Sequence, residues 1–101
     1  MNILLVPTIR QIYNDQFEYC VDKRLINLFQ KIFVNSKIDI YNNIINKKYD
    51  LIIFSGGNNS NVSKKKDKIR NSLDNKVYNF ALKKKIKILG ICHGAQFLAK
   101  K

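Results

Sequence analysis

Short apolar runs, each bounded by polar residues or glycine, recur along this chain. Continuous runs of this length, without polar alternation, are typical of strands that are covered on both faces of a sheet. The pattern predicts strands at Asn2–Val6, Lys37–Tyr41, Asp50–Ser55 and Lys87–Ile91.

Helical spacing appears between these runs. Apolar residues step by four and three at Phe17, Val21, Leu25, Leu28 and Ile32, which predicts one face of a helix that also carries Cys20 as a structural residue. A second helix is predicted around Leu73, Val77, Phe80 and Ala81, and a third from His93 onward. The segments Thr8–Asp15, Asn42–Lys48 and Gly56–Lys68 are predicted to be turns, connectors or loops.

Alternation of strands and helices predicts an α/β fold with a mostly parallel sheet and right-handed crossovers. In such sheets, binding sites form at the carboxyl ends of the strands. Two of these ends carry glycine and polar residues, Ser55–Asn58 and Gly90–Gly94.

Composition narrows the class of protein. The 101 residues suit a single domain, and no apolar run approaches the ~20 residues that cross a bilayer. The first residues lack the features of a signal peptide, so we expect a cytoplasmic protein without a membrane partner. The two cysteines do not suggest a disulfide framework, and we expect neither a metal nor a cofactor.

The net charge of +12 raises the question of a polyanionic partner. Lysine clusters occur at Lys64–Lys66, Lys83–Lys85 and Lys100–Lys101, in a loop, at a helix end and at the chain end, without interleaved aromatic residues. This pattern is more typical of a solvated surface than of specific nucleic-acid binding, which we do not expect.

The segment Gly90-Ile91-Cys92-His93-Gly94 has the pattern of a nucleophile elbow with a thiol in place of a hydroxyl. Such a turn presents the side chain above the sheet, and the helix N-terminus favours the thiolate form of Cys92. The backbone N–H of His93 would point toward the oxyanion that forms when Cys92 attacks a carbonyl group. We do not expect the His93 ring to act as the base, because adjacent elbow residues point in different directions.

A second oxyanion donor is expected from the Gly56-Gly57 turn, where a backbone N–H can approach a substrate closely. Gln96 follows Cys92 by four residues, so both lie on one helix face and the amide could hold a substrate beside the sulfur. The alternatives are a plain glycine turn and a cysteine that is only a small buried residue.

The sequence "LIIFSGGN" followed by "ILGICHGAQFLA" resembles the class I glutamine amidotransferase superfamily, and within it the γ-glutamyl hydrolase-like branch. "VPTIRQ" followed by Asn14-Asp15 is also similar to that branch, whereas Arg70-Asn71 departs from its frequent Arg-Asp pair. The resemblance implies a three-layer, flavodoxin-like fold.

The resemblance also implies a mechanism in which Cys92 attacks a γ-glutamyl amide, forms a thioester and releases glutamate. Gly57 and His93 would supply oxyanion-hole N–H groups, while Gly56 and Gln96 would help to bind the substrate. The narrowest match is to hydrolases of capsule-type gene clusters that act on a nucleotide-linked γ-glutamyl amidate.

In the family, a histidine and a glutamate that follow the nucleophile complete the triad, and the one histidine here is His93. We therefore expect residues 1–101 to be the N-terminal part of a single domain, truncated after the elbow or split. Such a chain would be inactive alone, and a second chain would supply the C-terminal half.

Two alternatives remain at this point. A PfpI-type protease or deglycase also carries Ile-Cys-His-Gly at an elbow. A non-catalytic remnant, or a half-domain that associates through its sheet edge, would need no chemistry at Cys92.

Overall fold

The computed structural model describes residues 1–43, 45, 47–59 and 64–101. The elements follow the order β1 (Asn2–Val6), β2 (Thr8–Tyr13), β3 (Gln16–Cys20), α1 (Lys23–Ile32), β4 (Lys37–Ile40), β5 (Leu51–Phe54), α2 (Lys65–Lys84), β6 (Lys87–Gly90) and α3 (His93–Ala99). No helix in these described ranges is both long and apolar enough to cross a membrane.

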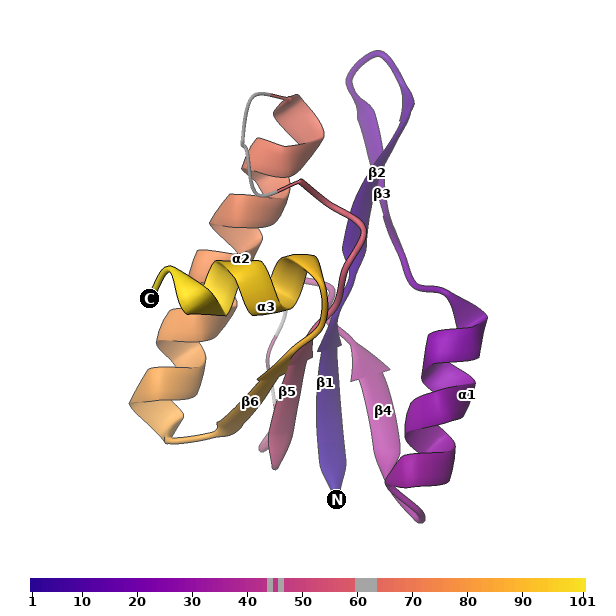
Figure 1. Cartoon of the computed structure of the whole chain (residues 1–101), viewed down its shortest axis with the longest axis vertical. Helices are drawn as coiled ribbons and strands as arrows, with labels where there is room; N and C mark the ends of the chain where they lie inside the picture. The colour runs from indigo at the N-terminus through magenta and orange to yellow at the C-terminus, as the bar shows by residue number, and fades with distance from the viewer. Residues whose placement is uncertain (44, 46, 60–63) are drawn as a thin grey trace.

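A four-stranded parallel sheet with the order β4-β1-β5-β6 forms the centre of the molecule (Figure 1). Its four strands agree with the four apolar runs, and all three pairings are parallel. The α/β class and the parallel sheet are therefore confirmed. β6 is an edge strand among the described residues, and the elbow cysteine follows directly at its carboxyl end.

Helices cover both faces of the sheet because neighbouring side chains of a strand point to opposite faces. Ile3 and Leu5 of β1 pack with Ile53 and with Phe29 of α1 on one face. On the other face, the cluster combines strand residues with α2 and α3, namely Leu4, Val6, Ile52, Phe54, Leu73, Val77, Ala81 and Phe97. The result is three layers, with α1 on one side and α2 and α3 on the other.

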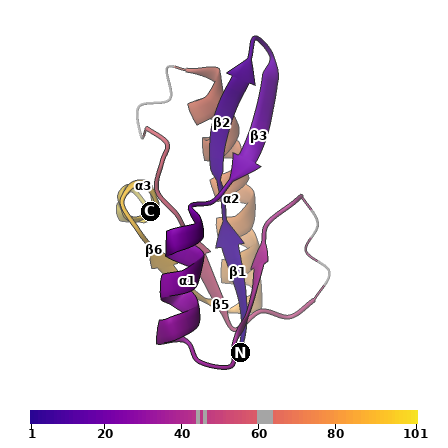
Figure 2. The same ribbon diagram turned by 90° about the vertical axis from the view of Figure 1, so that its right-hand side faces the viewer.

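The predicted turn at Thr8–Asp15 is wrong, because the chain forms an antiparallel hairpin of β2 and β3 there. Asn14 occupies the turn with φ 39°, a left-handed conformation that asparagine tolerates better than most residues. The hairpin extends beyond the carboxyl ends of the sheet in both views (Figures 1 and 2). Lys65 at the start of α2 lies 2.9 Å from the Asp15 carboxylate of the hairpin.

The predicted helix from Phe17 to Ile32 is correct only in its second half. Phe17 and Cys20 belong to β3, and α1 begins after Asp22, whose carboxylate accepts a hydrogen bond from the Arg24 N–H at 2.9 Å. Helix α1 buries Phe29, whereas Leu28 and Ile32 are 50% and 58% exposed. The apolar spacing from Phe17 to Ile32 therefore continued through strand β3, which is not helical. It also predicted that Leu28 is buried, whereas its neighbour Phe29 is the buried residue.

The remaining elements agree with the sequence except at their ends. Helix α2 begins at Lys65, inside the segment expected to be a loop, and buries Leu73, Val77 and Ala81 as expected. The predicted connector Asn42–Lys48 and the predicted loop Gly56–Lys68 both lie partly outside the described residues.

Replacing Phe29 with alanine tests which face of α1 is buried. We expect Phe29→Ala to lower the free energy of unfolding by about 3–5 kcal/mol, because it removes a buried ring from the core. Leu28→Ala is the matched control, and its effect should stay within about 0.5–1 kcal/mol because half of that side chain is exposed. Urea unfolding followed by circular dichroism measures both, and equal losses would contradict the assigned face.

Candidate active site

Cys92 lies in the turn between β6 and α3 with φ 52° and ψ −110°. A non-glycine residue rarely adopts this backbone conformation, and such conformations cost on the order of 1–3 kcal/mol. The residue is exposed, so it is not a small buried core residue. The strand–turn–helix context expected for a nucleophile elbow is therefore present.

Two glycines of the elbow are required because strand and helix backbones touch there. A Cβ at Gly94 would lie 2.0 Å from the Phe54 carbonyl oxygen, and a Cβ at Gly90 would lie 2.7 Å from the Ala95 nitrogen. Contacts that short leave no room for any side chain. The tight turn holds α3 directly over the end of β5.

The Gly56-Gly57 bend lies beside the elbow, as the sequence predicts. A Cβ at Gly56 would lie 3.0 Å from the Cys92 Cβ and 3.8 Å from its sulfur. Gly57 has φ 98°, and a Cβ there would lie 2.5 Å from two side-chain atoms of Thr8. The Thr8 hydroxyl donates to the Gly56 carbonyl at 2.6 Å, which ties the bend to the start of β2.

The backbone N–H groups of Gly57 and His93 have no acceptor within the part of the chain that the structure describes. His93 is the first residue of α3, where a helical N–H has no partner inside the helix. Both groups are thus available to an oxyanion near the sulfur, and their role stays a prediction.

Gln96 is exposed on α3, and its backbone N–H donates to the Cys92 carbonyl at 3.0 Å. A cavity of about 270 Å³ lies beside the bend, lined by Thr8, Val21, Asp22, Leu25, Ser55, Gly56 and Gly57. Neither Cys92 nor Gln96 lines this cavity, so the role of Gln96 in substrate binding also stays a prediction.

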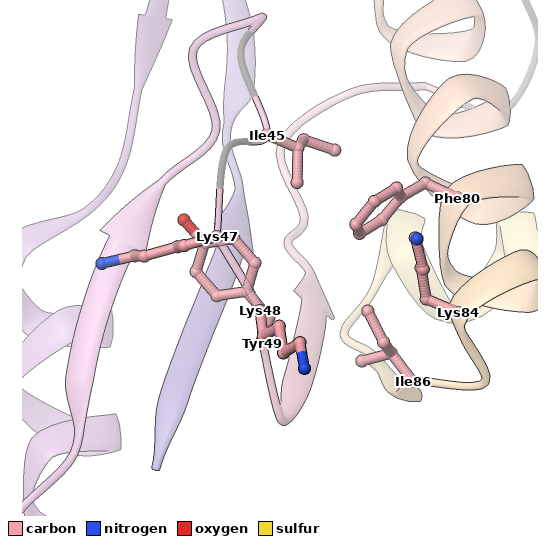
Figure 3. Close-up of a pocket in the computed structure, with 7 residues that line it drawn as sticks. All are labelled: Ile45, Lys47, Lys48, Tyr49, Phe80, Lys84 and Ile86. Atoms are coloured by element: carbon pink, nitrogen blue, oxygen red, sulfur yellow. The ribbon is translucent and has the colours of Figure 1, made fainter.

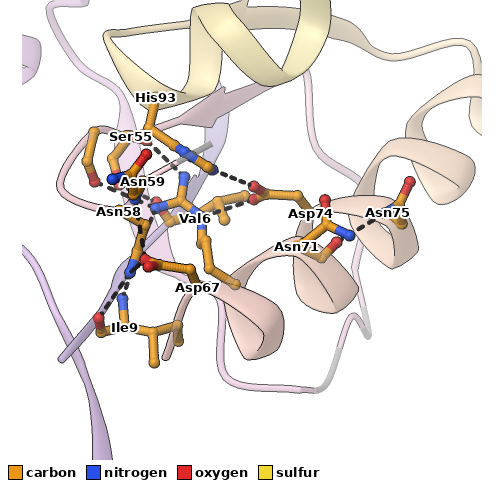
Figure 4. Close-up of polar contacts among 12 residues, drawn as sticks. Val6, Ile9, Ser55, Asn58, Asn59, Asp67, Asn71, Asp74, Asn75 and His93 are labelled. Carbon is orange, nitrogen blue, oxygen red and sulfur yellow. Dashed lines mark hydrogen bonds and ion pairs between the residues drawn. The ribbon is translucent and has the colours of Figure 1, made fainter. Parts of the chain in front are cut away.

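The His93 side chain is buried and faces α2 instead of the exposed thiol. Its Nε2 lies 3.0 Å from the Asp74 Oδ2, and since a carboxylate only accepts, Nε2 carries the proton (Figure 4). Its Nδ1 has no partner within the described residues. An imidazole held in this way is not placed to accept a proton from Cys92.

Arg70 is fully buried and connects helix α2 to the bend. Its Nε donates to Asp74 Oδ1 at 2.8 Å, and a terminal nitrogen donates to the Ser55 carbonyl at 2.6 Å. The other terminal nitrogen lies 3.2 Å from both the Gly56 carbonyl and the Asn58 side-chain oxygen. Breaking such a buried pair by removing one partner costs about 3–5 kcal/mol.

Asp67, one turn earlier on α2, holds the next part of the loop. Its carboxylate accepts from the Asn58 side chain at 3.2 Å and from the Asn59 N–H at 3.0 Å (Figure 4). Asn58 in turn exchanges two 2.9 Å hydrogen bonds with the backbone of Ile9. The bend is thus fixed to both α2 and β2.

Sequence reasoning missed this buried polar network. A signal was present, because Asp67, Arg70 and Asp74 follow a spacing of three and four and share a helix face with Leu73 and Val77. Charged residues inside an apolar face indicate buried partners. Asn71, where the sequence departs from the Arg-Asp pattern, is exposed beside this network.

A second cavity, of about 560 Å³, lies at the opposite ends of the strands (Figure 3). It is lined by Ile45, Lys47, Lys48, Tyr49, Phe80, Lys84 and Ile86 and contains no nucleophile from the elbow. The Tyr49 hydroxyl donates to Asp39 Oδ2 at 2.9 Å. Burial, followed by this hydrogen bond and the carboxylate charge, raises the pKa of Tyr49 to about 12.

An exposed thiol on a strained strand–helix turn of a parallel sheet defines the class of α/β proteins with a nucleophile elbow. A comparison with protein families matches residues 12–101 to the family described as glutamine amidotransferase class-I. The chain belongs to this family. The match does not specify a branch, and searches of curated proteins and of solved structures found no match.

Replacing Cys92 with glycine tests the strain at the elbow. We expect Cys92→Gly to raise the free energy of unfolding by about 1 kcal/mol, because glycine adopts this φ without a Cβ penalty. Cys92→Ala is the control, since it removes the sulfur, keeps the Cβ and should bring no gain. Denaturant unfolding measures both, and a glycine variant less stable than the alanine variant would contradict a strained elbow.

Titration with alkali tests the environment of Tyr49. Its pKa is above the ordinary value near 10, so the stabilisation is fully present below about pH 10 and is lost as the pH rises through about 12. Tyrosinate absorbance should show one of the five tyrosines titrating last, and Tyr49→Phe should remove that phase. Circular dichroism verifies that the chain stays folded, and an unchanged titration curve in the variant would contradict the assignment.

Proposed function

We propose that this protein is a cysteine-dependent hydrolase of γ-glutamyl amides, of the γ-glutamyl hydrolase-like branch of its family. The observation that supports this most is the exposed Cys92 at a positive-φ elbow, with the Gly56-Gly57 bend against it. Family membership supplies the expectation of a glutaminyl-type amide as substrate.

The reaction begins with the Cys92 thiolate adding to the δ-carbonyl carbon of the substrate. The carbonyl oxygen becomes an oxyanion, which accepts hydrogen bonds from the N–H groups of Gly57 and His93. Collapse of this intermediate breaks the C–N bond, and the amine leaves with the proton that the Cys92 thiol gave up to the proton acceptor of the triad. Water then gives a proton to the same acceptor and adds to the thioester, which releases glutamate and restores the Cys92 thiolate.

The glutamyl part of the substrate would lie along the bend, between Gly56 and Gln96. Gly56 allows close approach to the sulfur because a Cβ there would already touch Cys92. A nucleotide-linked amidate is the leaving group we favour. The net charge of +12 supports an anionic leaving group through long-range attraction.

The proton acceptor for Cys92 would belong to a further segment or chain that pairs with the edge of β6, which has one neighbouring strand among the described residues. Leu89 on this edge strand is 40% exposed, and the one imidazole of the sequence, that of His93, is bound to Asp74. A strand added beside β6 would reach its carboxyl end, where Cys92 lies. A histidine and a glutamate at that end would complete the triad.

Affinity labelling tests the proposed substrate without requiring the base. We expect a chloromethyl ketone analogue of glutamine to modify Cys92 at least ~10-fold faster than chloroacetone, which carries the same reactive group without the glutamyl part; this ratio corresponds to ~1.4 kcal/mol of recognition. Peptide mass spectrometry separates Cys92 from Cys20. Cys92→Ala is the control that must abolish labelling at this position.

Equal rates for the two ketones would contradict γ-glutamyl recognition. Preferential modification by glyoxals would favour the deglycase alternative. When the proposed partner segment is added, the protein should release glutamate from a γ-glutamyl amide.

A further inference from the structure

We infer that Arg70 and Asp74 are positioning residues that orient the Gly57 N–H toward the oxyanion and fix its position relative to Cys92 and His93. This role rests on the proposed function, because it presumes an oxyanion at Cys92. Neither side chain touches the sulfur. Both act through the backbone and the imidazole that they hold.

The first step of the argument concerns the peptide unit between Gly56 and Gly57. Its carbonyl accepts from Arg70 at 3.2 Å and from the Thr8 hydroxyl at 2.6 Å. A trans peptide is planar, so its N–H points opposite to its carbonyl, and the structure holds no cis peptide. Holding the Gly56 oxygen toward Arg70 therefore directs the Gly57 N–H away from α2.

The second step concerns the freedom that this contact removes. Gly57 adopts φ 98°, and glycine populates several backbone regions with similar ease. Arg70 also binds the Ser55 carbonyl at 2.6 Å, so one guanidinium fixes two successive peptide units. The planar guanidinium of arginine has several N–H donors that can bind two carbonyl groups at once, whereas the ammonium of lysine is a compact point charge.

The third step links the bend to the other expected donor. Asp74 binds Arg70 through one oxygen and His93 through the other, at 2.8 and 3.0 Å. His93 is the residue whose backbone N–H begins α3. A continuous path, Gly56–Arg70–Asp74–His93, whose last three side chains are buried, therefore connects the Gly56-Gly57 peptide unit to the first residue of α3.

Arg70→Lys and Asp74→Asn test this role, with the exposed Lys83→Ala on the same helix as control. Each variant is reacted with three reagents: the glutamine-analogue chloromethyl ketone, chloroacetone, and methyl methanethiosulfonate. The two ketones place a carbonyl oxygen beside the sulfur, and the thiosulfonate reports thiol reactivity without a carbonyl. Circular dichroism records whether each variant is folded.

We expect both ketones to react at least ~10-fold more slowly with Arg70→Lys, since complete loss of an oxyanion donor costs about 10²–10³-fold. The thiosulfonate rate should change less than about twofold, because the thiol stays exposed at the helix N-terminus. Asp74→Asn should give a smaller loss in the same direction, since it keeps an acceptor for Arg70. Lys83→Ala should leave all three rates unchanged.

A folded Arg70→Lys variant with wild-type ketone rates would overturn the inference, and so would equal losses with all three reagents. If Arg70→Lys does not fold, Asp74→Asn decides by the same comparison. Failure of the proposed function appears separately, as a wild-type protein that does not prefer the glutamine analogue to chloroacetone. Chloroacetone still reports the positioning role in that case, because its carbonyl oxygen would accept hydrogen bonds from the same N–H groups.

Discussion

The arrangement of the site depends on one buried guanidinium. Arg70 has no exposed side-chain surface, and its donors are distributed between Asp74 on its own helix and the carbonyls of Ser55 and Gly56. A buried cation is tolerated only when it is paired and hydrogen-bonded, so helix, loop and charge must be present together. These bonds, together with the one from Thr8 of β2 and those of Asn58 to β2 and α2, hold the bend after β5 beside Cys92.

Strain at the elbow complements this rigid support. Cys92 adopts an unfavourable backbone conformation, and Gly94 permits the close approach of α3 to the Phe54 carbonyl that accompanies it. The energy for this comes from the core, where Phe97 of α3 stacks on Phe54 at 5.6 Å between ring centres. The close approach of α3 to the end of β5 therefore accompanies both the packing of Phe97 and the exposed position of the Cys92 thiol.

The strands and the second half of the chain were predictable because their signals are local and unambiguous. Continuous apolar runs specified the four parallel strands, and Leu73, Val77 and Ala81 specified the buried stripe of α2. The β2–β3 hairpin was not, because it is short, polar and exposed at Ile12 and Tyr13, so no alternation marks it. Part of its second strand also continued the apolar spacing of α1, and spacing alone cannot distinguish the two.

By itself, the sequence indicated the elbow, since Gly90 and Gly94 on either side of Cys92 leave the room that strand and helix backbones need to touch. It also determined the Gly56-Gly57 turn and the parallel class of the sheet. Only the tertiary structure decided that the His93 ring binds Asp74 and that Arg70 reaches the bend. Those partners are separated by 14 to 19 residues, and their contacts exist only because α2 packs across β5 and α3. Local sterics can be deduced from neighbours in the chain, whereas the pairing of buried charges depends on which surfaces the whole core brings together.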